Sequence, residues 1–186
     1  YEAGKAVTTG ILNTIIGANA GLALTSGNSN VAVGTDALAT CQQGDKNTAL
    51  GYRALRAVNP SGNADTFNTA VGYAAGEDIT TGTSNVLVGG LAGDQITTGD
   101  ANVGVGQDAI GGNTLTGSSN TGIGTASGFA VSSGSNNIFL GHDAGRHGSP
   151  GGNITTASNE IGLGDENISA ANIQVDWTVA SDQRDK

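Results

Sequence analysis

Apolar and polar positions recur along the chain in one short unit. The unit reads Asn, then Thr or a branched aliphatic residue, then a usually small residue, then an aliphatic residue, then Gly. Eight copies begin at Asn13, Asn30, Asn47, Asn68, Asn85, Asn102, Asn120 and Asn137. A degenerate ninth copy begins at Glu160. Self-similarity at a fixed period is the signature of repeats that stack on one another, so the pattern predicts a solenoid.

The spacing of the copies predicts one coil for each unit. The sequence number rises by 17 from Asn13 to Asn30, and the following steps are 17, 21, 17, 17, 18, 17 and finally 23. Insertions that leave the motif intact belong on loops of a stacked array. The two longest insertions fall around 59–62 and within 146–158, where Pro and Gly favour loops.

Alternation assigns a role to each position of the unit. Side chains alternate along a strand, so the second and fourth positions share one face. We expect the fourth position to form a ladder in the core, because it is always aliphatic: Ile16, Val33, Leu50, Val71, Val88, Val105, Ile123, Leu140 and Leu163. The third position is usually Ala or Gly, which predicts a close approach there. The fifth is always Gly, as a tight corner with positive φ demands.

The Asn residues that open the copies would lie one above another in a stack. Such ladders form hydrogen bonds along the stacking direction. We therefore interpret these residues as structural and not as ligands of a metal or substrate.

Together these features predict an all-β fold, a trimeric parallel β-helix or β-roll solenoid of about 17-residue coils. Stacked rungs lie roughly 4.8 Å apart, so nine rungs would form a rod on the order of 40 Å long. A coil of this length encloses little volume, and the small third-position residues favour close packing between chains around an axis. We therefore expect a homotrimer.

Composition agrees with a thin or shared core. The chain has 186 residues, of which 32 are Gly, and aromatic residues make up 4%. Its 16 acidic and 7 basic residues give a net charge of −9, which argues against nucleic acid or an anionic membrane as partner. No stretch approaches the roughly 20 apolar residues of a membrane span. Cys41 is the only cysteine, so an intrachain disulfide is impossible, and we expect a half-buried apolar side chain.

Catalytic and metal-binding patterns are weak. His142, Asp143, Arg146 and His147 form the only cluster that contains His, and two His with one Asp could ligate a metal. Asp recurs after the motif Gly in other copies, so a polar surface loop is the simpler interpretation. The acidic pairs 77–78 and 165–166 are expected to be solvated turn residues. The sequence therefore predicts no cofactor and no metal site.

The repeats resemble a known class of fibre. Residues 10 to 170, with units such as Asn68-Thr-Ala-Val-Gly-Tyr-Ala-Ala-Gly76, resemble the repeat region of phage tail fibre proteins. They are also similar to the head repeats of trimeric autotransporter adhesins. The segment Ser181-Asp182-Gln-Arg184-Asp-Lys186 resembles the Ser-Asp-x-Arg-x-Lys motif that opens the endosialidase-type intramolecular chaperone domain, peptidase family S74. In that family the chaperone assists trimer assembly and then cuts itself off.

The resemblance to the chaperone family implies a self-cleavage junction. The cut would fall at Ser181–Asp182, with Ser181 as nucleophile and Lys186 as its base. Because the sequence ends at Lys186, we expect cleavage only in a precursor that carries the whole chaperone domain, and no other enzymatic activity. The implied organisation is a repeat shaft at 1–170, a capping strand at 171–181 and the start of the chaperone at 182–186.

The expected function is that of a viral tail fibre in the virion, outside the cell. Three chains would form a rigid shaft that displays loops to a host glycan or protein, after assembly with the intramolecular chaperone. No nucleic acid partner and no membrane insertion are expected. A bacterial adhesin head and the non-catalytic part of a polysaccharide-degrading tailspike remain alternatives. An ice-binding solenoid ranks low, because the Thr ladder of the second position is interrupted by Val31, Val86 and Val103.

Overall fold

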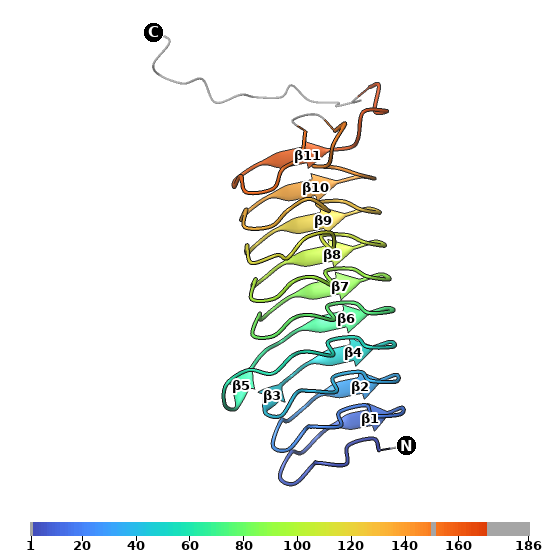
Figure 1. Ribbon diagram of the computed structural model, residues 1–186, viewed down its shortest axis with the longest axis vertical. Coiled ribbons are helices and arrows are strands. Elements are labelled where there is room, and N and C mark those ends of the chain that lie inside the picture. The colour runs from blue at the N-terminus through green and yellow to red at the C-terminus, as the bar shows by residue number, and fades with distance from the viewer. Residues whose placement is uncertain (1, 150–151, 171–186) are drawn as a thin grey trace.

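The computed structural model describes residues 2–149 and 152–170. These residues form an all-β parallel solenoid in which successive coils stack along one axis (Figure 1). The predicted fold class is confirmed. The predicted coil length is confirmed as well, because Asn13 bonds to Asn30, and Asn68 to Asn85, in the next coil. The number of chains in the assembly stays a prediction. No helix of the described residues has the length and hydrophobicity that crossing a membrane requires.

Each copy of the motif contributes one three-residue strand to a single sheet. The nine strands are β1 (Thr14–Ile16), β2 (Val31–Val33), β4 (Thr48–Leu50), β6 (Thr69–Val71), β7 (Val86–Val88), β8 (Val103–Val105), β9 (Thr121–Ile123), β10 (Ile138–Leu140) and β11 (Ile161–Leu163). All pair in parallel, and equivalent motif positions face each other, as in Ala49 with Ala70. The motif therefore sets the register of the sheet.

The insertions lie outside the main sheet, as predicted. Residues 59–62 form a loop just before β5 (Ala64–Asp65). That strand pairs with β3 (Gly44–Asp45) in a separate two-stranded sheet at the side of the solenoid (Figure 1). The described residues of 146–158 contain no strand either.

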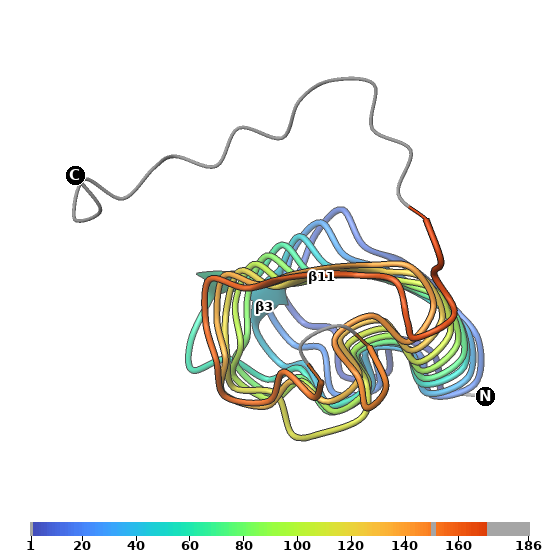
Figure 2. The same cartoon turned by 90° about the horizontal axis from the view of Figure 1, so that it is seen from above.

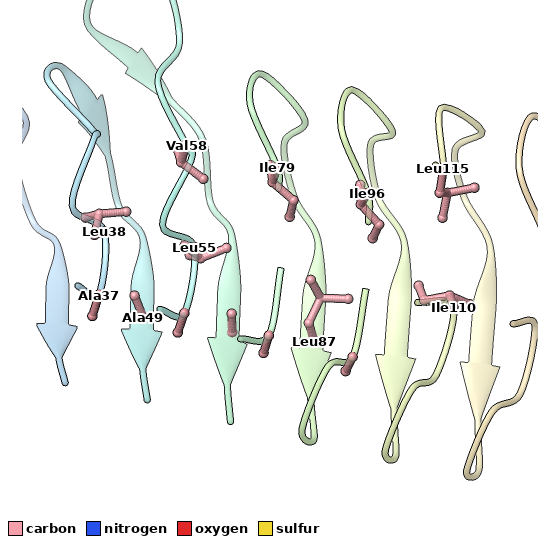
Figure 3. Packing of buried hydrophobic residues seen from close by; sticks show 14 of the residues in the cluster. Ala37, Leu38, Ala49, Leu55, Val58, Ile79, Leu87, Ile96, Ile110 and Leu115 are labelled. Atoms are coloured by element: carbon pink, nitrogen blue, oxygen red, sulfur yellow. The ribbon is translucent and has the colours of Figure 1, made fainter. Parts of the chain in front are cut away.

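The core lies between the third-position residues and the turns of the opposite wall (Figure 3). Side-chain sizes on the strands and on the opposite wall are complementary. Ala49 of β4 is accompanied by Leu55 on the opposite wall, and both are fully buried. Where the strand carries Leu87 instead, the opposite wall carries glycine. A Cβ on Gly93 would lie 2.5 Å from Leu87 Cδ2, and one on Gly76 would lie 2.9 Å from Leu87 Cδ1.

The expected core ladder at the fourth position is wrong for the single chain. Its members are exposed or half-buried, and Ile16 keeps 59% of its surface exposed. The third position points inward instead, and Ala32, Ala70 and Phe139 are fully buried. Alternation then places the second and fourth positions on the outer face. The close approach expected at the third position is confirmed, because a Cβ on Gly104 would lie 2.9 Å from Ile110 Cγ1 of the opposite wall. The approach is made within one chain, so the expectation that these small residues pack between chains is wrong.

The fifth-position glycines turn the corner after each strand, as predicted. Gly72 has φ of 139°, and a Cβ there would collide with the carbonyl oxygen of Gly89 in the next coil. The structure adds left-handed positions that the sequence did not reveal. The residue six places after the motif Asn has positive φ even where it is Arg53 or Leu91. Stacking overrides the local preference of these residues, since each such turn is tied to its neighbours, as by the bond from Arg53 N to Thr35 O.

Candidate functional site

The outer face of the nine-stranded sheet is the most unusual surface of the described chain. We call it the outer strip, and it consists of the second and fourth motif residues of β1, β2, β4 and β6 to β11. Four of its 18 positions hold Thr, and the other 14 are aliphatic, with no charged side chain. Its most exposed members include Ile161 at 60% and Leu163 at 46%. The strands that carry the strip stack along the rod (Figure 1), and seen from above they form one wall of its cross-section (Figure 2).

The outer strip is too long and too apolar to be ordinary solvent-facing surface. Nine rungs at about 4.8 Å extend for roughly 40 Å, and large contiguous apolar patches on soluble chains mark interaction sites or aggregation hazards. Most flanking residues at the two strand ends are polar or small, among them Lys46 and Asn136 on one side and Gln107 and His142 on the other, while Phe67 is an exposed apolar exception. An apolar band with a polar rim has the anatomy of a protein–protein interface.

An Asn ladder precedes the strands of the strip from β1 to β10 and joins successive coils by hydrogen bonds. Asn85 Oδ1 accepts a hydrogen bond from the backbone N of Asn102 at 2.9 Å, and Asn85 Nδ2 donates to the carbonyl of Gly99 at 2.9 Å. Asn68 repeats both bonds one coil earlier, to Asn85 N and Gly82 O. The seven Asn residues from the second copy to the eighth are fully buried. Their predicted structural role is confirmed.

An exposed aromatic pair flanks the strip on the side where the strands end. Tyr52 and Tyr73 follow the motif Gly in β4 and β6, and their rings stack with centroids 5.3 Å apart and planes 13° apart. The guanidinium of Arg53 lies 5.1 Å from the Tyr52 ring. We call the residues that directly follow the motif Gly in successive coils the aromatic column. The next residue of this column after Tyr73 is Gly90, because β6 and β7 pair in register at Val71 and Val88.

An ion-pair cluster adjoins the aromatic pair through Arg53, which contacts both Tyr52 and Glu77. The Glu77 carboxylate is 2.9 Å from Arg56 Nε and 3.5 Å from Arg53 Nη1, and its side chain is 17% exposed. The expectation that Glu77 is a solvated turn residue is therefore wrong. Stacking brings its coil over the coil that carries the two arginines.

Asp94 lies in an acidic environment that the sequence analysis did not single out. Burial raises the pKa of Asp94 to about 6, and the neighbouring carboxylates of Asp108 and Asp78 push it in the same direction. Its Oδ1 atom is buried without a hydrogen-bond partner. The sequence did contain a sign of this acidic environment. Three successive copies of the repeat carry Asp78, Asp94 and Asp108 after their strands, and stacking brings such residues together.

The predicted His cluster assembles only in part. His142 Nδ1 lies 3.3 Å from Asp165 Oδ2 and 3.5 Å from Asp143 Oδ2, and Arg146 Nη1 lies 2.9 Å from Asp143 Oδ1. Hydrogen bonds from the backbone and side chain of Asn167, and then from His142, lower the pKa of Asp165. Arg146 also covers the ring of Phe129 at 4.5 Å. Within the described ranges no group of three or more His, Cys, Asp or Glu is arranged to hold a metal.

The remaining residues singled out from the sequence are Cys41 and those of the C-terminal segment. Cys41 is fully buried, deeper than expected, and burial raises the pKa of its thiol to about 11. Such a thiol is a weak nucleophile at neutral pH. Ser181, Asp182, Lys186 and the capping strand at 171–181 lie outside the described residues.

No protein-family model, curated protein or solved structure matches the chain. The structural candidates are therefore the outer strip and the aromatic pair. Sequence reasoning predicted an aliphatic ladder but placed it inside, and it missed the aromatic pair. The pair becomes visible once the copies are aligned in register, because Tyr52 and Tyr73 then share a column.

Proposed function

We propose that this chain is a shaft segment of a homotrimeric viral tail fibre, in which three copies bury their outer strips against one another. The observation that carries the proposal is the uncharged and predominantly aliphatic surface that the strip presents over all nine strands. The tail-fibre assignment rests on the resemblance of the repeats and of the Ser181 to Lys186 segment to those families. The function of such a shaft is mechanical and multivalent, because it repeats every surface feature three times along a stiff rod.

A second copy of the same chain suits the strip better than an unrelated partner. The surface repeats with the period of the coils, so an identical copy in the same register meets matching contacts at every rung. The strip contains no charged residue, although the whole chain has a net charge of −9. Copies can therefore associate along the strip without burying like charges against one another.

Light scattering on a size-exclusion column tests the assembly. With the chain at micromolar concentration, we expect a mass three times that of the single chain, which is 18.2 kDa. A single-chain mass that does not change up to high micromolar concentration would contradict the trimer. A stable mass of twice the single chain would replace it with a dimer.

The fibre assignment has its own test in a precursor. A chain extended by a complete S74-type chaperone domain should release that domain, and N-terminal sequencing of the released part should begin at Asp182. Replacing Ser181 with Ala should stop the release. Release at another bond, or release that persists in the S181A precursor, would refute the junction.

A further inference from the structure

The column that contains the aromatic pair has a gap beside Tyr73. Tyr52 covers one face of the Tyr73 ring. On the other side the next coil presents Gly90, and a Cβ built there would meet no atom within 4 Å. Tyr73 is accordingly 58% exposed. One face of a fixed aromatic ring is thus open over a space about one coil high, roughly 4.8 Å.

The fold does not require glycine at position 90. The neighbouring Gly89 has φ of 139°, and a Cβ there would collide with the carbonyl oxygen of Gly106. Gly90 has neither a positive φ nor a close neighbour. Among the described glycines it alone combines these two features. The absence of a side chain at this point therefore keeps the Tyr73 face open without serving the backbone.

Polar groups border the far side of the gap. Gln107 occupies the column one coil beyond Gly90, since the backbone N of Asp108 donates to Gly90 O at 3.0 Å. Gln107 Nε2 donates to Asp108 Oδ2 at 3.1 Å, which holds an amide and a carboxylate side by side. Together they offer acceptors and a donor to hydroxyl groups.

We infer that Tyr73, the gap at Gly90, Gln107 and Asp108 form a binding site for a neutral pyranose ring of a glycan. A pyranose presents an apolar C–H face that packs on an aromatic ring, and hydroxyl groups at its edge that need hydrogen-bond partners. A phosphorylated or nucleic acid ligand fits less well, because the polar border includes the Asp108 carboxylate and the chain is acidic. The inference rests on the proposed function, for which it supplies the ligand class of host attachment, but the site is complete within one chain.

The pair of tyrosines is already fixed in the free protein. Tyr73 is stacked on Tyr52, and Arg53 lies against Tyr52. Little side-chain freedom remains to be lost when a sugar binds, which favours affinity. Single-site binding of one sugar ring is weak in general, and three copies on a trimer would raise the avidity.

An array of immobilised neutral oligosaccharides of hexoses and N-acetylhexosamines tests the site. Saturation-transfer NMR with the best-bound sugar then gives affinities for the full chain and three variants. We expect Tyr73→Ala and Gly90→Leu to weaken binding at least tenfold, the second by filling the gap. Ala18→Leu is the matched control, because it places the same side chain in the same column, in an earlier coil away from the tyrosines, and it should bind as the parent chain does.

Light scattering and thermal unfolding of the same samples report the assembly state and the folding of each variant. A loss of sugar binding can then be separated from dissociation or unfolding. A trimer whose sugar binding survives both Tyr73→Ala and Gly90→Leu, or that binds no sugar, refutes the site and leaves the fibre proposal standing. A monomer that binds sugar through Tyr73 supports the site and refutes the trimer. If Tyr73→Ala dissociates the assembly while Gly90→Leu leaves sugar binding unchanged, the pair is a subunit contact and the site is refuted.

Discussion

At the scale of single residues, the core depends on matching large side chains with glycine across a narrow gap. Leu87 occupies the space left by Gly76 and Gly93, and Phe139 occupies the space beside Gly128 and Gly145. In the coils where the strand carries Ala32 or Ala49, a Leu of the opposite wall fills the same space. A large residue on the strand therefore requires glycine at the facing positions of the opposite wall, and a small residue on the strand leaves room there for a large one.

Replacing Leu87 with Ala should destabilise the chain by about 3 kcal/mol, because a fully buried Leu is removed and glycine neighbours cannot refill the cavity. Leu87→Met conserves volume and should cost less than about 1.5 kcal/mol. Urea unfolding followed by circular dichroism measures both. Equal losses for the two variants would show that the gap closes by movement of the backbone.

Asp94 should make stability depend on pH. Its pKa is raised from 3.8 to about 6 in the folded chain, so the free energy of unfolding falls as the pH rises through this window. Asp94→Asn should therefore stabilise the chain at pH 8, by about 1 kcal/mol after allowance for solvent screening at a half-exposed group. At pH 4 the variant and the parent should unfold alike. A gain of the same size at both pH values would exclude titration of Asp94 as the cause.

At the scale of elements, the strands are too short to be stable alone, and the Asn ladder ties them together. Each of the nine strands has three residues. The bond from Asn47 N to Asn30 Oδ1 and the bond from Asn30 Nδ2 to the Gly44 carbonyl satisfy backbone groups where a strand begins. Buried polar groups without partners are costly, so the ladder fixes both register and strand start.

Asn85→Ala should cost about 2–4 kcal/mol, because it leaves the Asn102 N–H and the Gly99 carbonyl buried without partners. Asn63→Ala is the control, since Asn63 is exposed and accepts one side-chain bond from Ser26. The control should change the free energy of unfolding by about 0.5 kcal/mol or less. Chemical denaturation of both variants decides whether the ladder stabilises the fold or only accompanies it.

At the scale of the whole molecule, the outer strip determines what the rod can do. One chain buries the third-position residues by itself, and it leaves the second and fourth positions in solvent. Exposed aliphatic surface of this length favours association. The residues that follow the motif Gly, among them Tyr52 and Tyr73, lie beside the strip and not within it.

Val88→Lys combined with Ile123→Lys places two charges in the middle of the strip and should convert the expected trimer into the single chain of 18.2 kDa. The fold of each coil should survive, because both side chains point outward. The control is Thr81→Lys, at an exposed turn away from the sheet. Light scattering reports the masses, and a double variant that stays trimeric would show that the copies associate through another surface.

The sequence by itself determined the coil length, the number and register of the strands in the nine-stranded sheet, the Asn ladder, the glycine corners and the sites of the insertions. Each follows from the period, since identical units that stack must pair identical positions. The tertiary structure alone decided which face of the strand is inside, because alternation defines two faces and does not say which one meets the opposite wall. It also decided the ion pairs of Glu77, the environment of Asp94 and the gap beside Tyr73. These arise between neighbouring coils, where residues distant in sequence are brought within one rung of each other.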